Sequence, residues 1–120
     1  MPSRDEHLAK AKHNEKVAAS LAPEYSDWIV VAIFYAALHY VEMQLAVEGT
    51  HPKSHDKRDP SIAKHHLLGP NIWNSYKKLN VLSRNVRYYS FPIAEADVSN
   101  AKTWLESIKS YLKSIGHKLD

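Results

Sequence analysis

The sequence predicts an all-α fold, an up-and-down bundle of four to five helices formed by residues 1–120 as a single domain. Three observations support this prediction. The stretch from Trp28 to Val47 is apolar almost all round, which is typical of a helix covered on several sides at the centre of a bundle. The segment from Glu95 to Ile115 has apolar residues at alternating steps of three and four, the period of an amphipathic helix. The chain has only three glycines and no segment of alternating polar and apolar residues, so we expect no strands.

Capping residues and breaks place the first two helices. We expect the first over about residues 5–21, with Asp5 or Ser3 as its N-cap. The second is expected over about residues 24–48, because Pro23 suits the first turn of a helix and Gly49 suits the position after the last one. Short connections favour antiparallel neighbours in the bundle.

The second half of the chain predicts a short helix and two long ones. A polar loop over residues 50–59 ends in Asp59-Pro60, which is typical of an N-cap and the first position of a helix over 60–68. Gly69-Pro70 is expected to stop this short helix, and Asn71 is expected to cap the next, which runs to about Tyr89. In the last helix, over about residues 95–115, Trp104 and Tyr111 form a second stripe that widens the core contact or provides a surface for a partner.

Composition limits the classes of function. The absence of cysteine excludes disulfides and thiolate metal sites. Residues 1–16 are charged throughout and lack the apolar region of a signal peptide. The longest uncharged stretch of the apolar helix, Trp28–Val41, is shorter than the about 20 residues that cross a bilayer. We therefore expect a soluble, cytoplasmic protein without membrane association. Its net charge of +3 permits nucleic-acid binding without requiring it.

The histidines do not form a familiar metal motif. His51-x3-His55 lies in a loop without further fixed ligands, and the adjacent His65 and His66 would point about 100° apart on a helix. His39-x-x-Glu42 is single, and it is reversed relative to the Glu-x-x-His motif of di-iron bundles. Three glycines do not supply a phosphate-cradling loop. We therefore expect neither a metal nor a cofactor.

Residues 83–91, Ser-Arg-Asn-Val-Arg-Tyr-Tyr-Ser-Phe, are the most informative segment for function. Arg84 and Arg87 stand beside Tyr88 and Tyr89 near one helix end, a combination of cations and stacking surface that favours phosphates and bases. The same composition also fits a helix C-terminus with favourable cations and core tyrosines. The sequence leaves these two interpretations open.

Two further pairs of residues are candidates for the same site. Tyr35 and His39 are four residues apart on the apolar helix, where they form either a hydrogen-bonded pair in the core or part of a site. His55 and Arg58 precede the short helix and either face the same groove or belong to an ordinary polar loop.

Over about residues 7–115, the order and spacing of these segments resemble the HEPN domain superfamily. The opening helix over 7–14 precedes Asp27-Trp28 and the run Phe34-Tyr35-Ala36-Ala37-Leu38-His39-Tyr40, which is similar to a Tyr-Tyr-Ala-x-Phe-His-like run in the second helix of HEPN proteins. Ser54-His55, the Arg84 segment and the regular amphipathic helix follow in order. The resemblance implies a bundle of four or five helices that is usually dimeric.

In the nuclease members of this superfamily, the motif is often written Arg-Asn-x-x-x-His-x-Tyr. The motif converges across the dimer and cuts RNA without a metal through attack of the 2′-hydroxyl. The resemblance implies that the Arg stabilises phosphate charge and that the His transfers protons.

This chain departs from that motif. Arg84 and Asn85 match its first two positions, whereas Tyr89 stands at the His position and Phe91 at the final Tyr position. A tyrosine with a pKa of about 10 is a poor general base at neutral pH, so the resemblance implies a HEPN-like module without standard nuclease chemistry. Arg58-x6-His65 also satisfies the spacing, but it spans a loop and a proline.

Three functions are therefore expected as alternatives. In the first, a homodimer binds RNA, a nucleotide or a protein partner through a groove near Arg84, Arg87 and Tyr88. In the second, the chain is a metal-independent ribonuclease toxin of a toxin–antitoxin or defence system, in which His55 or His39 replaces the missing base and a nucleotidyltransferase-type antitoxin is the partner. In the third, the chain is a structural interaction domain that binds its partner through the second stripe of the last helix.

Overall fold

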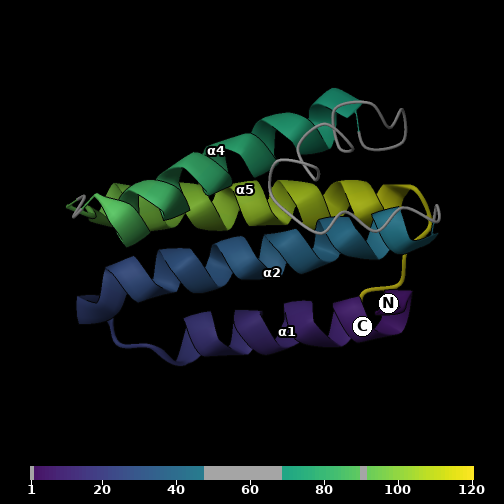
Figure 1. Ribbon diagram of the computed structural model, residues 1–120, viewed down its shortest axis with the longest axis horizontal. Helices are drawn as coiled ribbons and strands as arrows, with labels where there is room; N and C mark the ends of the chain where they lie inside the picture. The colour runs from purple at the N-terminus through teal and green to yellow at the C-terminus, as the bar shows by residue number, and fades with distance from the viewer. Residues whose placement is uncertain (1, 48–68, 90–91) are drawn as a thin grey trace.

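The computed structural model describes residues 2–47, 69–89 and 92–120 (Figure 1). Over these ranges the chain is helical and contains no strand, which confirms the all-α prediction. The elements are α1 (Arg4–Ser20), the 3₁₀ turn η1 (Pro23–Tyr25), α2 (Ser26–Val47), α4 (Gly69–Tyr88) and α5 (Glu95–Ser114). The expected loop over 50–59 and the short helix over 60–68 lie outside the described residues.

Helix α2 is the centre of the bundle. Helices α1, α4 and α5 each pack against α2, and α4 also packs against α5. Figure 1 shows α1 and α4 on opposite sides of α2, with α5 between α2 and α4 in this view and passing behind α4 at the left. In this view α1 and α2, α2 and α4, and α4 and α5 run in opposite directions, as the prediction of antiparallel neighbours requires.

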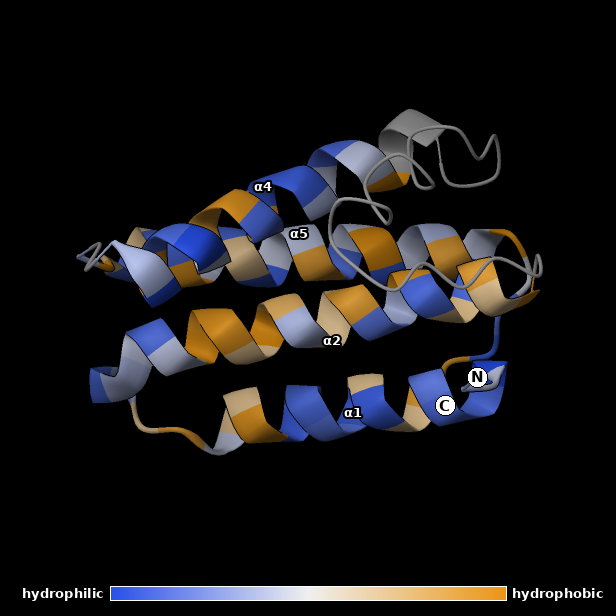
Figure 2. Cartoon of the chain, viewed as in Figure 1, coloured by the Kyte–Doolittle hydropathy of each residue, from blue (hydrophilic) through white to orange (hydrophobic). Residues whose placement is uncertain are grey.

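The burial of α2 explains its composition. Every residue from Ile29 to Phe34 is buried, so all sides of this part of the helix are covered. Figure 2 shows α2 as the most apolar helix and α1 as mostly hydrophilic. The two ends of α2 differ, because Trp28 is 59% exposed and Val47 is 57% exposed. The inclusion of Trp28 in the covered stretch is therefore wrong, since its position in the first turn of α2 places it at an end of the bundle.

The stretch Pro23–Val47 is the one helical segment within the described residues that is long and apolar enough to cross a membrane. However, 72% of its most apolar part is buried inside the protein. Such burial is typical of the core helix of a soluble protein, because α1, α4 and α5 already cover the side chains that lipid would contact.

The N-termini of α1 and α4 can be compared with the capping residues predicted from the sequence. Ser3 caps α1 through a capping box, in which the Glu6 backbone N–H donates to Ser3 Oγ at 3.2 Å and the Ser3 N–H donates to Glu6 Oε1 at 3.1 Å. Of the two expected caps, Ser3 is therefore the correct one. Helix α4 begins at Gly69, so the prediction that Asn71 caps this helix is wrong, and the predicted stop of the short helix at Gly69-Pro70 concerns residues outside the described ranges. A proline is tolerated in the first turn, where its missing N–H would have no intrahelical partner.

Helix α5 packs on the core as its period predicts. Its fully or nearly covered residues are Ala101, Leu105, Ile108 and Leu112. Trp104 and Tyr111 are half-buried and pack against the same core, with Lys78 Nζ 5.9 Å from the centre of the Trp104 ring. Among the described residues, this second stripe widens the contact with the core.

An ion pair joins α1 and α5. Lys109 Nζ lies 3.2 Å from Glu15 Oε2 and 5.8 Å from the centre of the Tyr40 ring. Burial, together with the neighbouring Glu15 carboxylate, raises the pKa of the Tyr40 hydroxyl well above its usual range. The Tyr40 hydroxyl therefore stays protonated, and the side chain packs in the core rather than taking part in acid–base chemistry.

Candidate functional site

The C-terminal end of α4 presents aromatic and cationic side chains to solvent. Tyr88 is 68% exposed and Tyr89 is 69% exposed, and Arg84 is exposed one turn before Tyr88. The Tyr89 backbone N–H donates to the Asn85 carbonyl oxygen at 3.1 Å, just beyond the end of the helix. The interpretation of these tyrosines as core residues is therefore wrong.

Arg87 has a fixed position between α4 and α2. Its Nη1 donates a hydrogen bond to the Tyr35 hydroxyl at 3.0 Å, and its Nε donates to the Ser83 carbonyl oxygen at 3.3 Å. The guanidinium centre lies 5.5 Å from the Phe34 ring centre, 5.7 Å from that of Tyr35 and 5.1 Å from that of Tyr88. These are cation–π distances. Its hydrogen-bond partners are neutral, and no carboxylate among the described residues forms an ion pair that would offset its charge.

Tyr35 connects Arg87 to a cavity between α1 and α2. The cavity has a volume of about 450 Å³ and no carboxylate in its lining, which consists of Ala9, Lys10, His13, Asn14, Tyr35 and His39. Tyr35 and His39 are both half-buried at this cavity. Each contacts a group on another helix, Tyr35 on α4 and His39 on α1. The pair therefore belongs to a polar surface that crosses the bundle from α1 over α2 to α4.

We call this surface the α1–α2–α4 site. It comprises Lys10, His13, Asn14, Tyr35, His39, Arg84, Arg87 and Tyr88. The first three come from α1, the next two from α2 and the last three from α4. Cations and aromatic rings predominate, so the chemistry of the surface suits an anionic ligand with a planar group.

A cluster of ionisable groups lies beside this site, between α1 and α2. His7 Nδ1 lies 3.2 Å from His39 Nδ1 and 3.4 Å from Glu42 Oε2, and His39 Nδ1 lies 3.9 Å from the same Glu42 oxygen. His7 is buried, and the other two side chains are largely covered. We call these three residues the His7–His39–Glu42 cluster.

Sequence reasoning found two members of this cluster and missed the third. His39-x-x-Glu42 stood out as a single pair, whereas His7 is 32 residues away from His39 in the sequence. The signal that could have found His7 is its register, because His7, Ala11 and Asn14 follow steps of four and three on the face of α1 that packs on α2. A polar residue at such a position is expected to have a polar partner on the neighbouring helix.

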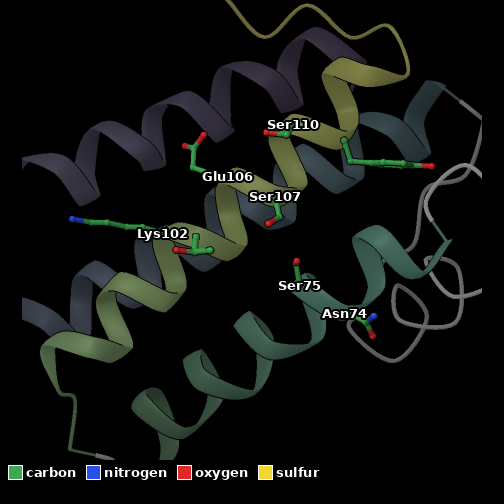
Figure 3. Close-up of a pocket in the computed structure, with 8 residues that line it drawn as sticks. Asn74, Ser75, Lys102, Glu106, Ser107 and Ser110 are labelled. Atoms are coloured by element: carbon green, nitrogen blue, oxygen red, sulfur yellow. The ribbon is translucent and has the colours of Figure 1, made fainter.

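Two larger cavities lie elsewhere on the described part of the bundle. Figure 3 shows the one between α4 and α5, of about 790 Å³, with Ser75 of α4 and Ser107 of α5 on facing walls and with Glu106 in its lining. The other, of about 750 Å³, lies between α1, α2 and α5 and includes Glu15, Glu95 and Glu106. Neither contains a residue predicted to bind RNA or a nucleotide, although Tyr111 of the second stripe lines the first, and their carboxylates disfavour a phosphate-bearing ligand.

The structure thus brings together four of the predicted site residues, namely Tyr35, His39, Arg87 and Tyr88. Arg84, Asn85 and Tyr89 lie along the same end of α4. His55 and Arg58 lie outside the described residues. In comparisons with known proteins, no family model and no curated protein matches the chain.

Proposed function

We propose that the chain is a HEPN-like helical domain that binds RNA or a nucleotide at the α1–α2–α4 site, as a homodimer and without the standard nuclease chemistry of that superfamily. The hydrogen bond between Arg87 and Tyr35 carries this proposal. It joins the arginine segment of α4 to a cavity whose lining contains no carboxylate. One ligand can therefore contact cations from both α1 and α4.

Arg87 is prepared to bind a phosphate group. Its two hydrogen bonds within the protein use a minority of the N–H donors of a guanidinium. The remaining donors can form the paired hydrogen bonds that arginine makes with phosphate oxygens. Because Tyr35 and Ser83 already hold the side chain, binding costs little of its conformational entropy.

Tyr88 supplies a stacking surface next to this cation. Its ring is 68% exposed and its centre lies 5.1 Å from the Arg87 guanidinium. Stacking of a base on an aromatic side chain contributes about 1–3 kcal/mol to single-strand binding. Arg87 and Tyr88 together therefore match the phosphate and the base of one nucleotide.

The expectation of altered chemistry rests on Tyr89. It occupies the position of the nuclease histidine in the resemblance, and its side chain is 69% exposed. A phenol, with an ordinary pKa of about 10, is a poor general base at neutral pH. The proposed domain therefore binds its RNA or nucleotide ligand without cleaving it through the standard motif.

The outward face of α4 supports the proposed homodimer. Lys77, Val81, Arg84 and Tyr88 follow steps of four, three and four and are all exposed, with Val81 50% exposed. An exposed stripe that contains valine and tyrosine is a suitable contact for a second copy. A two-fold contact along it would bring two Arg84 side chains to one shared groove.

Fluorescence anisotropy with a labelled single-stranded RNA tests this proposal. Arg87→Ala is expected to weaken binding by about 10- to 100-fold, the effect of losing a hydrogen bond to a charged group. Lys113→Ala is the matched control, because this lysine is exposed on α5, a helix that contributes no residue to the site. Affinity should fall as salt rises, and competition with a mononucleotide will distinguish a nucleotide site from an RNA site. If Arg87→Ala and Lys113→Ala bind RNA equally well, the proposal is wrong.

The metal-independent ribonuclease is a second candidate because of one observation. His39 lines the same cavity as Tyr35, which is bonded to Arg87, so a base and a cation face one ligand. In this candidate His39 replaces the missing base beside Arg84, and a nucleotidyltransferase-type antitoxin would cover the site. Cleavage of RNA in the presence of EDTA, lost in both His39→Ala and Arg84→Ala, would support it. Intact RNA after incubation with the unmodified protein would exclude it.

A further inference from the structure

We propose that the His7–His39–Glu42 cluster is a binding site for a divalent transition-metal ion, with Zn²⁺ as the ion it fits best. The inference departs from the expectation, drawn from the sequence, that the chain has no metal site. It does not depend on the proposed binding of RNA.

The geometry of the three atoms is that of a metal site. His7 Nδ1, His39 Nδ1 and Glu42 Oε2 form a triangle with sides of 3.2, 3.4 and 3.9 Å. The point equidistant from these three atoms lies about 2 Å from each, which is the length of zinc–nitrogen and zinc–oxygen bonds. Tetrahedral zinc with such bonds separates its ligand atoms by about 3.3 Å. One ion can therefore contact all three atoms after small shifts of the side chains.

The donor set selects the class of metal. Two imidazoles and one carboxylate are the protein ligands of several catalytic zinc sites. Imidazole suits zinc, copper, iron and nickel, whereas magnesium and calcium prefer oxygen ligands throughout. The short sides of the triangle agree with four-coordinate zinc better than with the larger shell of a calcium ion.

Burial gives a cation an electrostatic role in the cluster. The exposed fractions of the side chains are 6% for His7, 13% for Glu42 and 18% for His39. A carboxylate removed from water to this extent requires compensation by hydrogen bonds or positive charge. A divalent ion provides that charge and accepts the lone pairs of all three donors. The alternative is a hydrogen-bonded cluster in which one imidazole carries a proton on Nδ1 and the other does not.

Two packed helices hold the ligands in place. His39 and Glu42 are one turn apart on α2, and His7 extends from α1, which packs along α2. Sites on helices keep their geometry better than sites on loops. Three protein ligands leave a further position for water or another ligand, and His39 also lines the cavity between α1 and α2, through which such a ligand can arrive.

Metal titration of the full chain tests the proposal. Protein freed of metal with a chelator and dialysed is titrated with ZnCl₂ in a calorimeter and with CoCl₂ in a spectrometer. We expect one ion per chain, a Co²⁺ spectrum of the intensity typical of four-coordinate sites, and displacement of Co²⁺ by Zn²⁺. Glu42→Gln and His7→Gln should weaken zinc binding by about 100-fold or more, because loss of a second-shell partner alone costs about 10- to 100-fold.

The controls separate this cluster from the other histidines. His13→Gln removes an exposed histidine of α1 that lines the same cavity but is outside the triangle, so its zinc affinity should equal that of the unmodified chain. Arg87→Ala should also leave zinc affinity unchanged, which separates this test from that of RNA binding. Glu42→Gln keeps the size of the side chain, and circular dichroism will verify that it folds. Failure to bind one Zn²⁺ per chain, or equal affinity in Glu42→Gln, His7→Gln and His13→Gln, would show that the cluster is only hydrogen-bonded.

Discussion

Arg87 Nη1 donates a hydrogen bond of 3.0 Å to the Tyr35 hydroxyl, across 52 residues of sequence. The bond ties the C-terminal end of α4 to the middle of α2. It also aligns the guanidinium with the Phe34 and Tyr35 rings, at 5.5 and 5.7 Å from their centres. A polar contact of this kind fixes the direction in which the arginine presents its remaining donors.

Tyr35→Phe is the first test of this relationship. The substitution keeps the ring and removes the acceptor, so Arg87 keeps its cation–π contacts and loses its fixed direction. We expect the free energy of unfolding to fall by about 0.5–1.5 kcal/mol, the net contribution of one hydrogen bond. RNA affinity should fall by a smaller factor than in Arg87→Ala, because the charge remains.

Tyr25→Phe is the control for this substitution. Tyr25 is 47% exposed in the 3₁₀ turn before α2 and is remote from Arg87 in the sequence. Urea denaturation and RNA anisotropy should give the same values for Tyr25→Phe and the unmodified chain. Unchanged stability and affinity in Tyr35→Phe would show that the contact has no functional role.

The capping box at Ser3 leads to a second prediction. Helix α1 is mostly hydrophilic and the C-terminal residues of the helix have no basic side chain, so its N-terminal cap is an important local stabiliser. The hydrogen bond that the Ser3 backbone N–H donates to the Glu6 carboxylate lowers the pKa of Glu6. Ser3→Ala should lower the free energy of unfolding by about 1 kcal/mol, as measured by urea denaturation.

Ser20→Ala provides the comparison at the other end of α1. The Ser20 hydroxyl donates to the Val17 carbonyl oxygen at 2.9 Å, and the residue is exposed. Surface substitutions of this type change stability by less than about 0.5 kcal/mol. Equal effects of Ser3→Ala and Ser20→Ala would contradict the special role of the cap.

The helices could be predicted from local signals because each signal has a physical cause within a few residues. The period of α5 and the continuous apolar run of α2 gave both helices within a few residues of their observed ends. The start of α4 could not be fixed in this way. Gly69-Pro70 suits both the end of one helix and the first turn of the next, and the pattern of neighbours does not choose between them.

The candidate site was only partly predictable, for a different reason. Arg84, Arg87 and Tyr88 were predicted because cations and aromatic residues occur together in their segment. Whether such residues are exposed at a binding surface or buried in the core depends on where α5 and α2 pack. The contact of His7 with His39 is set by the register of α1 against α2. The spacing of His7 and Ala11 places His7 on the packed face of α1, but it does not show that His39 is the residue of α2 that it meets.

The pKa of His117 predicts a dependence of stability on pH. Its Nε2 contacts the Oε1 of the buried Gln44, and burial, followed by the positive charge of Arg4, lowers the His117 pKa below its usual 6.5. Below pH 6.5 the unfolded chain therefore takes up a proton that the folded chain resists, so stability falls as the pH falls through this range.

A comparison of pH profiles will check this prediction. The free energy of unfolding should fall more steeply for the unmodified chain than for His117→Gln between about pH 7.5 and about pH 5.5. The difference between the two curves isolates His117, because the other histidines are present in both proteins. Parallel curves would mean that His117 has the same proton affinity in the folded and unfolded chains.

The exposed stripe of α4 gives a final prediction, on the proposed homodimer. Val81 lies between Lys77 and Arg84 on this stripe and is 50% exposed, so in a single chain its replacement by a charged residue leaves the core unchanged. In a dimer that packs along this stripe, Val81→Glu would bury an unpaired carboxylate beside its symmetry mate. We therefore expect light scattering after size-exclusion chromatography to give twice the 13.7 kDa mass for the unmodified chain and the single mass for Val81→Glu.

Lys113→Glu, on the exposed side of α5, should leave the dimer intact. A single mass for the unmodified chain at high concentration would remove the homodimer from the proposed function, while the binding of RNA to one chain would still be decided by Arg87→Ala.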